Sequence, residues 1–419
     1  SSQELPIAPP AGSHHRPRTR LWPKIQSVVV PLGLVAIVTA ANIVTRGLWP
    51  SDETRLMAIA WEMWTRGEWL VPRFNGAVEA LPPLFFWAVQ LGWRVLGEVE
   101  WWPRLVPVLF LLGSLLIASR LVLLLWAGQG VVARQLPLML VGSFSLALSV
   151  ALLALPTVVM FFTLLFLHAL LWRWRYRDHR LWLLMGITLG LGMLAGGGVL
   201  LLYVLPVALL APLWGRRQPT IPWTYWYADL FKAGVLATII FALWALPASG
   251  RVGMSALLPL FTAPTDILLL DLFPNDRPWW WLLFLLPWLT FPWSLWPLPW
   301  LRLWHIRRQP LGNGLSFCIV WAVTAIAIFS ALPGREPQFL LPVAPAFLLV
   351  VAWLLLDERH EDHDHSRLAS TITFPLLLLG GVLAILPGLP RVPHLPEFLW
   401  GLSPFVGVSI IGLGVAIGW

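Results

Sequence analysis

The sequence contains few charged residues. Asp, Glu, Lys and Arg make up 11% of its 419 residues, against about 25% in soluble globular proteins. Together with a hydrophobic content of 58%, this scarcity excludes an ordinary soluble domain and a disordered chain. The single cysteine, Cys318, excludes an intrachain disulfide. Only 4 tyrosines accompany 29 tryptophans, and tryptophan is typical of membrane interfaces.

The net charge of +8 does not indicate nucleic acid. No Lys/Arg-rich run with interleaved aromatic residues occurs outside the predicted loops, so we expect no nucleic-acid partner. Arginines in loops that fix the orientation of a membrane protein produce the same balance. Membrane lipids are therefore the expected surroundings.

Long apolar runs fill most of the chain. A spanning helix needs about 20 mostly apolar residues, and the sequence offers about twelve candidates. They are Val28–Val44, Leu105–Trp126, Leu136–Ala154, Thr157–Trp172, Leu181–Leu194, Val199–Trp214, Leu230–Leu246, Trp279–Leu298, Leu315–Leu332, Phe339–Leu356, Thr371–Leu386 and Trp400–Trp419. The predicted fold is an all-α polytopic membrane protein, with residues 1–24 as a flexible cytoplasmic tail and residues 25–419 as one transmembrane domain.

The distribution of Lys and Arg predicts the orientation. With a cytoplasmic N-terminus, the side that receives the Arg173–Arg180 and Arg302–Arg308 loops carries more of these cations than the opposite side. Such a bias follows the positive-inside rule. It places residues 46–104, here called the outer-face segment, on the outer side of an inner (plasma) membrane, together with Arg251 and Arg335.

The outer-face segment begins with a predicted amphipathic helix. Ser51 is a candidate N-cap, and Asp52 and Glu53 lie in the first turn. At helical spacing, Leu56, Ile59, Ala60 and Met63 fall on one face. A loop containing Arg73, Asn75 and Gly76 follows, and Pro82–Pro83 opens a second juxtamembrane helix. The segment therefore predicts a pair of helices at the membrane surface.

Several ordered motifs in this segment resemble a known family. They are Asp52-Glu53-Thr54-Arg55, Glu62-Met63, Gly67-x-Trp69-x-x-Pro72, Asn75-Gly76 and Pro82-Pro83-Leu84-x-x-Trp87. In this order they are similar to motifs of the GT-C class of lipid-linked-sugar glycosyltransferases, especially the aminoarabinose transferases of lipid A and the protein O-mannosyltransferases. The resemblance continues to about Trp353, through weaker motifs such as Gln338-Phe339-Leu340-Leu341-Pro342.

The resemblance implies a fold, a reaction and a set of site residues. The fold would be a GT-C bundle of about twelve spanning helices. A polyprenyl-phosphate sugar would donate its sugar to a lipid or protein acceptor at the outer face. Asp52 would be the leading acid, which binds a divalent cation or activates the acceptor hydroxyl, with Glu53 as its partner. Arg55, Arg73, Glu79 and Arg335 would line the substrate site. From the residues alone, Asp52 and Glu53 are equally typical of helix capping, and the arginines equally typical of lipid anchoring or ion pairing.

Other positions depart from the family pattern. The family has an acid before the proline between the third and fourth spans, where this chain has Leu155 before Pro156. It has Glu-Lys before Pro-Pro-Leu, where this chain has Ala80-Leu81, and a lysine where this chain has Gly196–Gly198. Asn275 stands where the family has histidine. These losses suggest an alternative function, a catalytically degenerate homologue that serves as a structural or assembly subunit of a membrane complex.

Further candidates were weighed for a compensating role. Asp266, Asp271 or Asp276 could supply a second acid from another loop. The run His360–His365 alternates histidine with carboxylates, which suits zinc or nickel but equally a solvated loop. His168 lies within a span, where we expect a packing role. No separate soluble domain is expected after the last apolar segment, which ends at Trp419.

Overall fold

The structure is a computed structural model. It describes residues 29, 31–37, 39–40, 43, 52–143, 155–215, 221–262, 278–291, 293–295, 297–306, 311–332, 335, 337–356, 373, 377–378, 380–388 and 404–418. Within these ranges the chain is helical apart from loops and one two-stranded hairpin. The all-α prediction is therefore confirmed.

In the described ranges, two short strands occur near the start of an otherwise helical series of elements. They are α2 (Asp52–Thr65), β1 (Arg73–Phe74), β2 (Ala77–Val78), α3 (Leu84–Leu96), α4 (Trp101–Leu125), α5 (Gly130–Val141), α7 (Leu155–Tyr176), α8 (Leu181–Gly196), α9 (Val199–Leu209), α10 (Ala211–Trp214), α11 (Trp223–Val252), α12 (Met254–Leu257), α13 (Pro259–Thr262), α14 (Trp281–Leu289), η2 (Trp293–Leu295), α15 (Pro297–Ile306), α16 (Asn313–Ala331), η3 (Pro337–Val343), α17 (Ala344–Leu356), η4 (Leu386–Gly388) and α19 (Pro404–Gly418).

Five helical stretches in the described ranges are long and apolar enough to cross a membrane. They are Trp101–Leu125, Leu155–Tyr176, Trp223–Val252, Asn313–Ala331 and Pro337–Leu355. Each coincides with a predicted span. A helix is the form such a segment takes, because lipid offers no partner for its backbone N–H and C=O groups. The chain is a multi-pass membrane protein.

Not every predicted span is one continuous helix. Val199–Trp214 is divided into α9 and α10. Trp279–Leu298 was expected to be a single helix, but the structure divides it into α14, η2 and the start of α15. Proline contributes to the break before α15, because its missing N–H removes one bond of the helical hydrogen-bond ladder. Pro297 begins α15, where the missing donor costs nothing.

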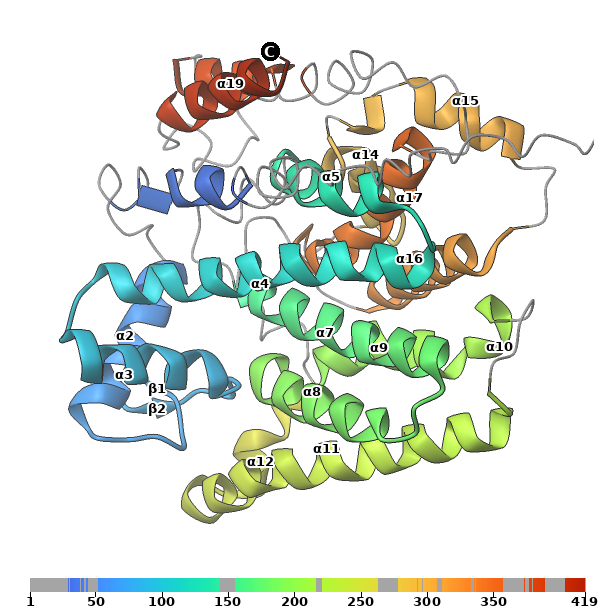
Figure 1. Cartoon of the computed structure of the whole chain (residues 1–419). Coiled ribbons are helices and arrows are strands. Elements are labelled where there is room, and N and C mark those ends of the chain that lie inside the picture. The colour runs from blue at the N-terminus through green and yellow to red at the C-terminus, as the bar shows by residue number, and fades with distance from the viewer. Residues whose placement is uncertain are drawn as a thin grey trace, which may run out of the picture.

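The central layer of the bundle consists of α4, α7, α8 and α11, which pack side by side (Figure 1). Glycine permits the close approach of α8 to α11. A Cβ atom on Gly186 would lie 2.8 Å from Leu236, and one on Gly190 would lie 2.8 Å from Ile240. Both distances are too short for real contacts. The four-residue spacing of these glycines is the small-residue interface typical of membrane helices.

The outer-face segment gathers at one end of the bundle, next to the end of α11 and α12 (Figure 1). Its predicted helical pair is confirmed as α2 and α3, joined through the β1–β2 hairpin. Its apolar side chains form a cluster separate from the main core of the bundle. We call this the α2–α3 cluster. Its buried members are Leu56, Ile59, Ala60, Met63, Leu81, Phe85, Phe86, Val89, Trp93, Val106 and Leu155.

A buried ion pair joins α7 to α11 at the opposite end of the bundle. Arg173 donates to Asp229, with Nη2 and Nε 2.7 and 2.8 Å from Oδ2. The two side chains are only 5% and 6% exposed. Because buried charges are costly unless paired, this contact fixes the relative position of the two helices.

Candidate functional site

Helix α2 carries the leading acids. Its four predicted apolar positions, Leu56, Ile59, Ala60 and Met63, are all buried in the α2–α3 cluster, so the predicted amphipathic face is confirmed. The helix begins at Asp52, whose side chain lies outside the described part of the structure, as does Ser51. Glu53 in the first turn is only 4% exposed.

Arg55 and Glu79 lie in direct contact. Arg55 Nη2 is 2.8 Å from Glu79 Oε2, and both side chains are partly buried. The Arg55 guanidinium also lies 5.7 Å from the centre of the Phe74 ring. Its Nε atom is buried and has no hydrogen-bond partner. The structure thus brings together two of the predicted substrate residues, and one N–H of Arg55 stays available.

Arg73 belongs to the hairpin. Asn75 and Gly76 have φ angles of 51° and 83°, which is the left-handed conformation that an Asn-Gly turn requires. Arg73 Nη1 donates to the Gly76 carbonyl at 3.0 Å, and the Gly76 N–H donates to Glu62. The arginine therefore stabilises the turn between β1 and β2.

Arg335 and Gln338 lie beyond the end of α16. Arg335 Nε donates to the Ser330 carbonyl at 2.8 Å. Gln338, in η3, has a side-chain amide that is buried with neither its nitrogen nor its oxygen paired. An unpaired buried amide costs free energy. The Arg55–Glu79 pair belongs to the outer-face segment, whereas Arg335 lies between α16 and η3, so these predicted site residues come from two separate parts of the chain.

The two leucines that replace family polar residues lie in the same apolar cluster. Leu81 and Leu155 are 3% and 8% exposed, and both belong to the α2–α3 cluster. Leu155 is the first residue of α7, whereas Leu81 precedes α3. Side chains 74 positions apart thus belong to the same cluster as the apolar face of the helix that carries Asp52. The family's acid and lysine positions are replaced by apolar packing.

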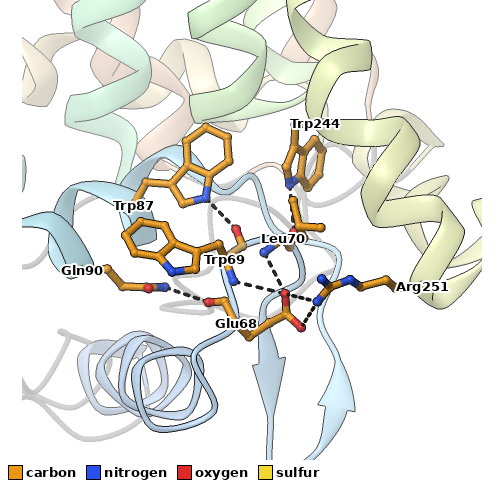
Figure 2. A network of polar contacts seen from close by, with 7 residues as sticks. All are labelled: Glu68, Trp69, Leu70, Trp87, Gln90, Trp244 and Arg251. Carbon is orange, nitrogen blue, oxygen red and sulfur yellow. Dashed lines mark hydrogen bonds and ion pairs between the residues drawn. The ribbon is translucent and has the colours of Figure 1, made fainter.

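A second polar network fixes the loop between α2 and β1 (Figure 2). Glu68 accepts hydrogen bonds from the backbone N–H groups of Trp69 and Leu70, and its Oε2 lies 2.7 Å from Arg251 Nη1. Donors on two helices contact the same loop: Trp87 Nε1 bonds the Trp69 carbonyl, Gln90 Nε2 the Glu68 carbonyl and Trp244 Nε1 the Leu70 carbonyl.

This network was missed by the sequence analysis. Arg251 was correctly placed on the side of the outer-face segment. No sequence pattern, however, predicts its pairing with Glu68, which lies 183 positions away. The Gly-x-Trp-x-x-Pro motif was the available signal, because Trp69 lies at its centre and Arg94 stacks on its ring at 4.4 Å. The network ties the outer-face segment to the end of α11.

We expect Glu68→Gln to loosen this loop. Burial raises the pKa of Glu68, but the hydrogen bonds from Leu70 and Trp69 and the charge of Arg251 outweigh it, so the pKa is lowered from its ordinary 4.5. A lowered pKa means that the pair stabilises the fold above the ordinary value and that this contribution is lost as the pH falls through the lowered value.

Hydrogen exchange of residues 67–71 would measure this effect. Because Arg251 is largely exposed, the Gln variant should reduce the protection factor only roughly two- to fivefold at pH 7. Protection should also fall below pH 4.5 in the wild type but not in the variant. Glu100→Gln, an exposed acid on the same segment, is the control. Equal protection in all three proteins would contradict the role of Glu68.

The structure assembles no metal site in the part of the chain that it describes. No group of three or more His, Cys, Asp or Glu side chains gathers there, and Glu79 is already paired with Arg55. The remaining candidates, Asp266, Asp271, Asn275, Asp276 and the run His360–His365, lie outside the described residues. His168 is described: its ring packs against Trp172, with centroids 5.7 Å apart.

Sequence relatives of the chain are bacterial sugar transferases. An undecaprenyl phosphate-alpha-4-amino-4-deoxy-L-arabinose arabinosyl transferase of Pectobacterium carotovorum is 29% identical over 411 residues, 94% of this chain and 70% of that protein. One from Pseudomonas fluorescens is 28% identical over 371 residues, 81% of this chain. The chain spans 61% of the length of the latter relative. It matches no protein-family model.

Solved structures show the same fold. ArnT from Cupriavidus metallidurans bound to undecaprenyl phosphate superposes with a TM-score of 0.70 at 18% identity, over 94% of this chain and 76% of that one. The apo oligosaccharyltransferase of Archaeoglobus fulgidus superposes with a TM-score of 0.54 at 12% identity, over 96% of this chain and 56% of that one. The chain is therefore a multi-pass membrane protein with the GT-C fold, and its sequence resembles the undecaprenyl phosphate-dependent aminoarabinose transferases.

Proposed function

We propose that the chain is a membrane glycosyltransferase that moves a sugar from a polyprenyl-phosphate donor to a lipid or protein acceptor. The observation that carries this proposal is the sequence likeness to arabinosyl transferases over 94% of the chain, together with the motifs of the outer-face segment. The names of these relatives supply the donor class, an undecaprenyl-phosphate sugar.

The reaction exchanges one bond at the anomeric carbon. The acceptor hydroxyl oxygen attacks this carbon, the bond to the donor phosphate oxygen breaks, and polyprenyl phosphate leaves with the electron pair. The hydroxyl proton passes to a base. We assign Asp52 as this base because it begins α2, in the segment that carries the family motifs. Glu53, the next residue along the chain and itself buried, is assigned as its partner.

Arg55 is the residue that would bind the leaving phosphate. Its Nε–H has no partner, and its Nη2 is shared with Glu79. A phosphate that displaces the groups covering Arg55 Nε could accept from this N–H and could compete with Glu79 for Nη2. Charge-assisted hydrogen bonds of this kind stabilise the negative charge that develops on the leaving group. Glu79 then keeps the guanidinium in place between turnovers.

Asp52→Asn should abolish transfer while the protein still folds. The change removes one negative charge at nearly constant volume, and loss of a general base lowers rates by about 10²–10⁴-fold. The measurement is sugar transfer from an undecaprenyl-phosphate sugar by the purified full chain, with expression and thermal stability recorded in parallel. Glu100→Gln is the matched control. Transfer at the wild-type rate would remove Asp52 from the site, and an unfolded variant would support helix capping instead.

The proposed reaction requires the outer-face segment to face away from the cytoplasm of an inner-membrane protein. We infer a cytoplasmic N-terminus from the arginine bias. A cysteine at Asn75, in the exposed turn, should react with an impermeant reagent in intact cells, whereas one at Arg177, exposed beyond α7, should not. The native Cys318 is buried and gives no background. The reverse labelling pattern would invert the topology.

A second candidate function is favoured by one observation, the burial of Leu81 and Leu155 in the α2–α3 cluster. A degenerate homologue that serves as a subunit of a membrane complex would replace charged site residues with apolar packing, because polar groups near a bilayer are costly. Purification in mild detergent followed by mass spectrometry separates the two functions. A subunit would travel with other membrane proteins and show no transfer.

A further inference from the structure

The segment Trp172–Arg177 divides its side chains between two sides of α7. Arg173 and Trp174 point inward: the first pairs with Asp229, and the second packs against Trp214, Trp223 and Trp226. Trp172, Arg175 and Tyr176 are exposed. Half of this basic and aromatic segment is therefore used by the fold, and the other half is left on the surface of a membrane-spanning helix.

The exposed half continues along α7 and onto α4. His168 lies one turn before Trp172, and the rings of His168, Trp172 and Tyr176 follow one another with centroids 5.7 and 6.5 Å apart. Arg175 falls on the same face as His168, since seven residues make two turns of a helix. The neighbouring helix α4 runs alongside α7: Thr157 Oγ1 bonds the Pro107 carbonyl, and a Cβ atom on Gly113 would lie 2.5 Å from Phe161. This register places Arg120 at the level of His168.

The two arginines of this face, Arg120 and Arg175, have no acidic partner in the described part of the structure. Neither Arg120 nor Arg175 forms an ion pair or hydrogen bond there, and His168 Nδ1 is buried without a partner. Arg120 is also flanked on α4 by exposed apolar residues, Leu116 and Leu123. It thus faces the acyl region, five residues before the end of α4 and about 7.5 Å below it at 1.5 Å per residue.

An arginine at this depth needs an anion. Charged side chains in a spanning segment are costly unless they pair or reach the head-group level. Basic groups between spanning helices bind the phosphates of anionic lipids, and tryptophan and tyrosine rings pack at the same level. Arg120, His168 and Arg175 supply donors at successive levels on adjacent helices, with Trp172 and Tyr176 beside them.

We propose that the surface where α4 packs against α7, here called the α4–α7 surface and formed by Arg120, His168, Trp172 and Arg175, binds the head-group phosphate of an anionic glycerophospholipid. This surface lies at the end of the bundle opposite α2, so it is separate from the proposed transfer site and does not depend on that function. Its ligand is a lipid of the surrounding bilayer, with its acyl chains along the exposed apolar residues of α4.

Native mass spectrometry of the full chain in mild detergent tests this proposal. Phosphatidylglycerol and phosphatidylcholine are added separately at equal concentration, and the retained lipid is counted. We expect the wild type to retain phosphatidylglycerol in preference to phosphatidylcholine. Each arginine contributes about fivefold in affinity near a membrane surface, so Arg120→Gln with Arg175→Gln should weaken retention by ~30-fold. Single variants should fall between.

Arg180→Gln is the matched control, because Arg180 is exposed at the same end of the bundle but immediately precedes α8, outside the α4–α7 surface. It should retain phosphatidylglycerol as the wild type does. Thermal stability of each variant shows whether it is folded. Equal retention by the double variant, an equal loss in Arg180→Gln, or equal retention of phosphatidylcholine would overturn the proposal. Displacement by equimolar inorganic phosphate would assign the α4–α7 surface to a soluble anion and overturn the lipid assignment.

Discussion

Asp229→Asn is expected to destabilise the protein strongly. Arg173 and Asp229 are almost fully buried, and their charged atoms lie 2.7 Å apart. Removing one charge leaves the other buried without compensation, a change that typically costs about 3–5 kcal/mol. The substitution keeps the side-chain volume nearly constant, so the loss reports on charge. Thermal unfolding in detergent, with ligand-free protein, is the measurement.

Two further variants separate this ion pair from a general effect of charge. Lys232 lies 3.6 Å from Asp229 but is 54% exposed, so Lys232→Gln should have an effect of about 1 kcal/mol or less. Arg173→Met combined with Asp229→Leu should recover most of the stability, because well-packed apolar residues can replace a buried pair. If Asp229→Asn unfolds at the wild-type temperature, the pair does not fix α7 to α11.

The spans were the predictable part of the fold. An apolar run such as Leu105–Trp126 has only one stable form in lipid, and α4 follows it within a few residues. The division of Trp279–Leu298 was not predicted, although Pro297 offered a local signal. The close contact of α8 with α11 could have been read from Gly186 and Gly190. Which helix they face depends on packing that no local pattern specifies.

The candidate site was predictable only through the family motifs. Arg55 and Glu79 carry no local signal that pairs them, and the hairpin brings them together by reversing the chain between β1 and β2. The resemblance grouped Arg73 with Arg55 and Glu79. In the structure, the Arg73 guanidinium donates a hydrogen bond to the Gly76 carbonyl in the turn. Glu68 and Arg251 belong to distant segments, and their contact follows from tertiary packing alone.

The two replaced family positions connect the sequence to the energetics of the site. The motif comparison predicts that Leu81 and Leu155 occupy positions around one cavity, and the structure places both in the α2–α3 cluster. Two buried leucines stabilise this cluster by about 1.5–3 kcal/mol each. This stabilisation comes from the two positions at which the family pattern has a carboxylate and an ammonium group.

Restoring the charges tests whether the two positions still act on each other. Leu155→Asp and Leu81→Lys should each destabilise the protein by about 2–4 kcal/mol at mid-bilayer depth and less near the interface. The double variant should cost less than the sum, with a coupling of about 0.5–3 kcal/mol, because opposite charges in one cluster attract. Thermal stability in detergent for both single variants and the double variant gives this coupling.

The control pairs Leu81→Lys with Leu355→Asp. Leu355 is equally buried but belongs to the main core of the bundle, near the far end of α17, so its aspartate cannot reach the new lysine and the two costs should add. Strict additivity for Leu81 and Leu155 as well would contradict their shared cluster.

The same double variant also bears on function. Sugar transfer that appears only when both charges are restored would show that the site around Asp52 still accepts a donor, whereas a stable but inactive double variant would favour the subunit.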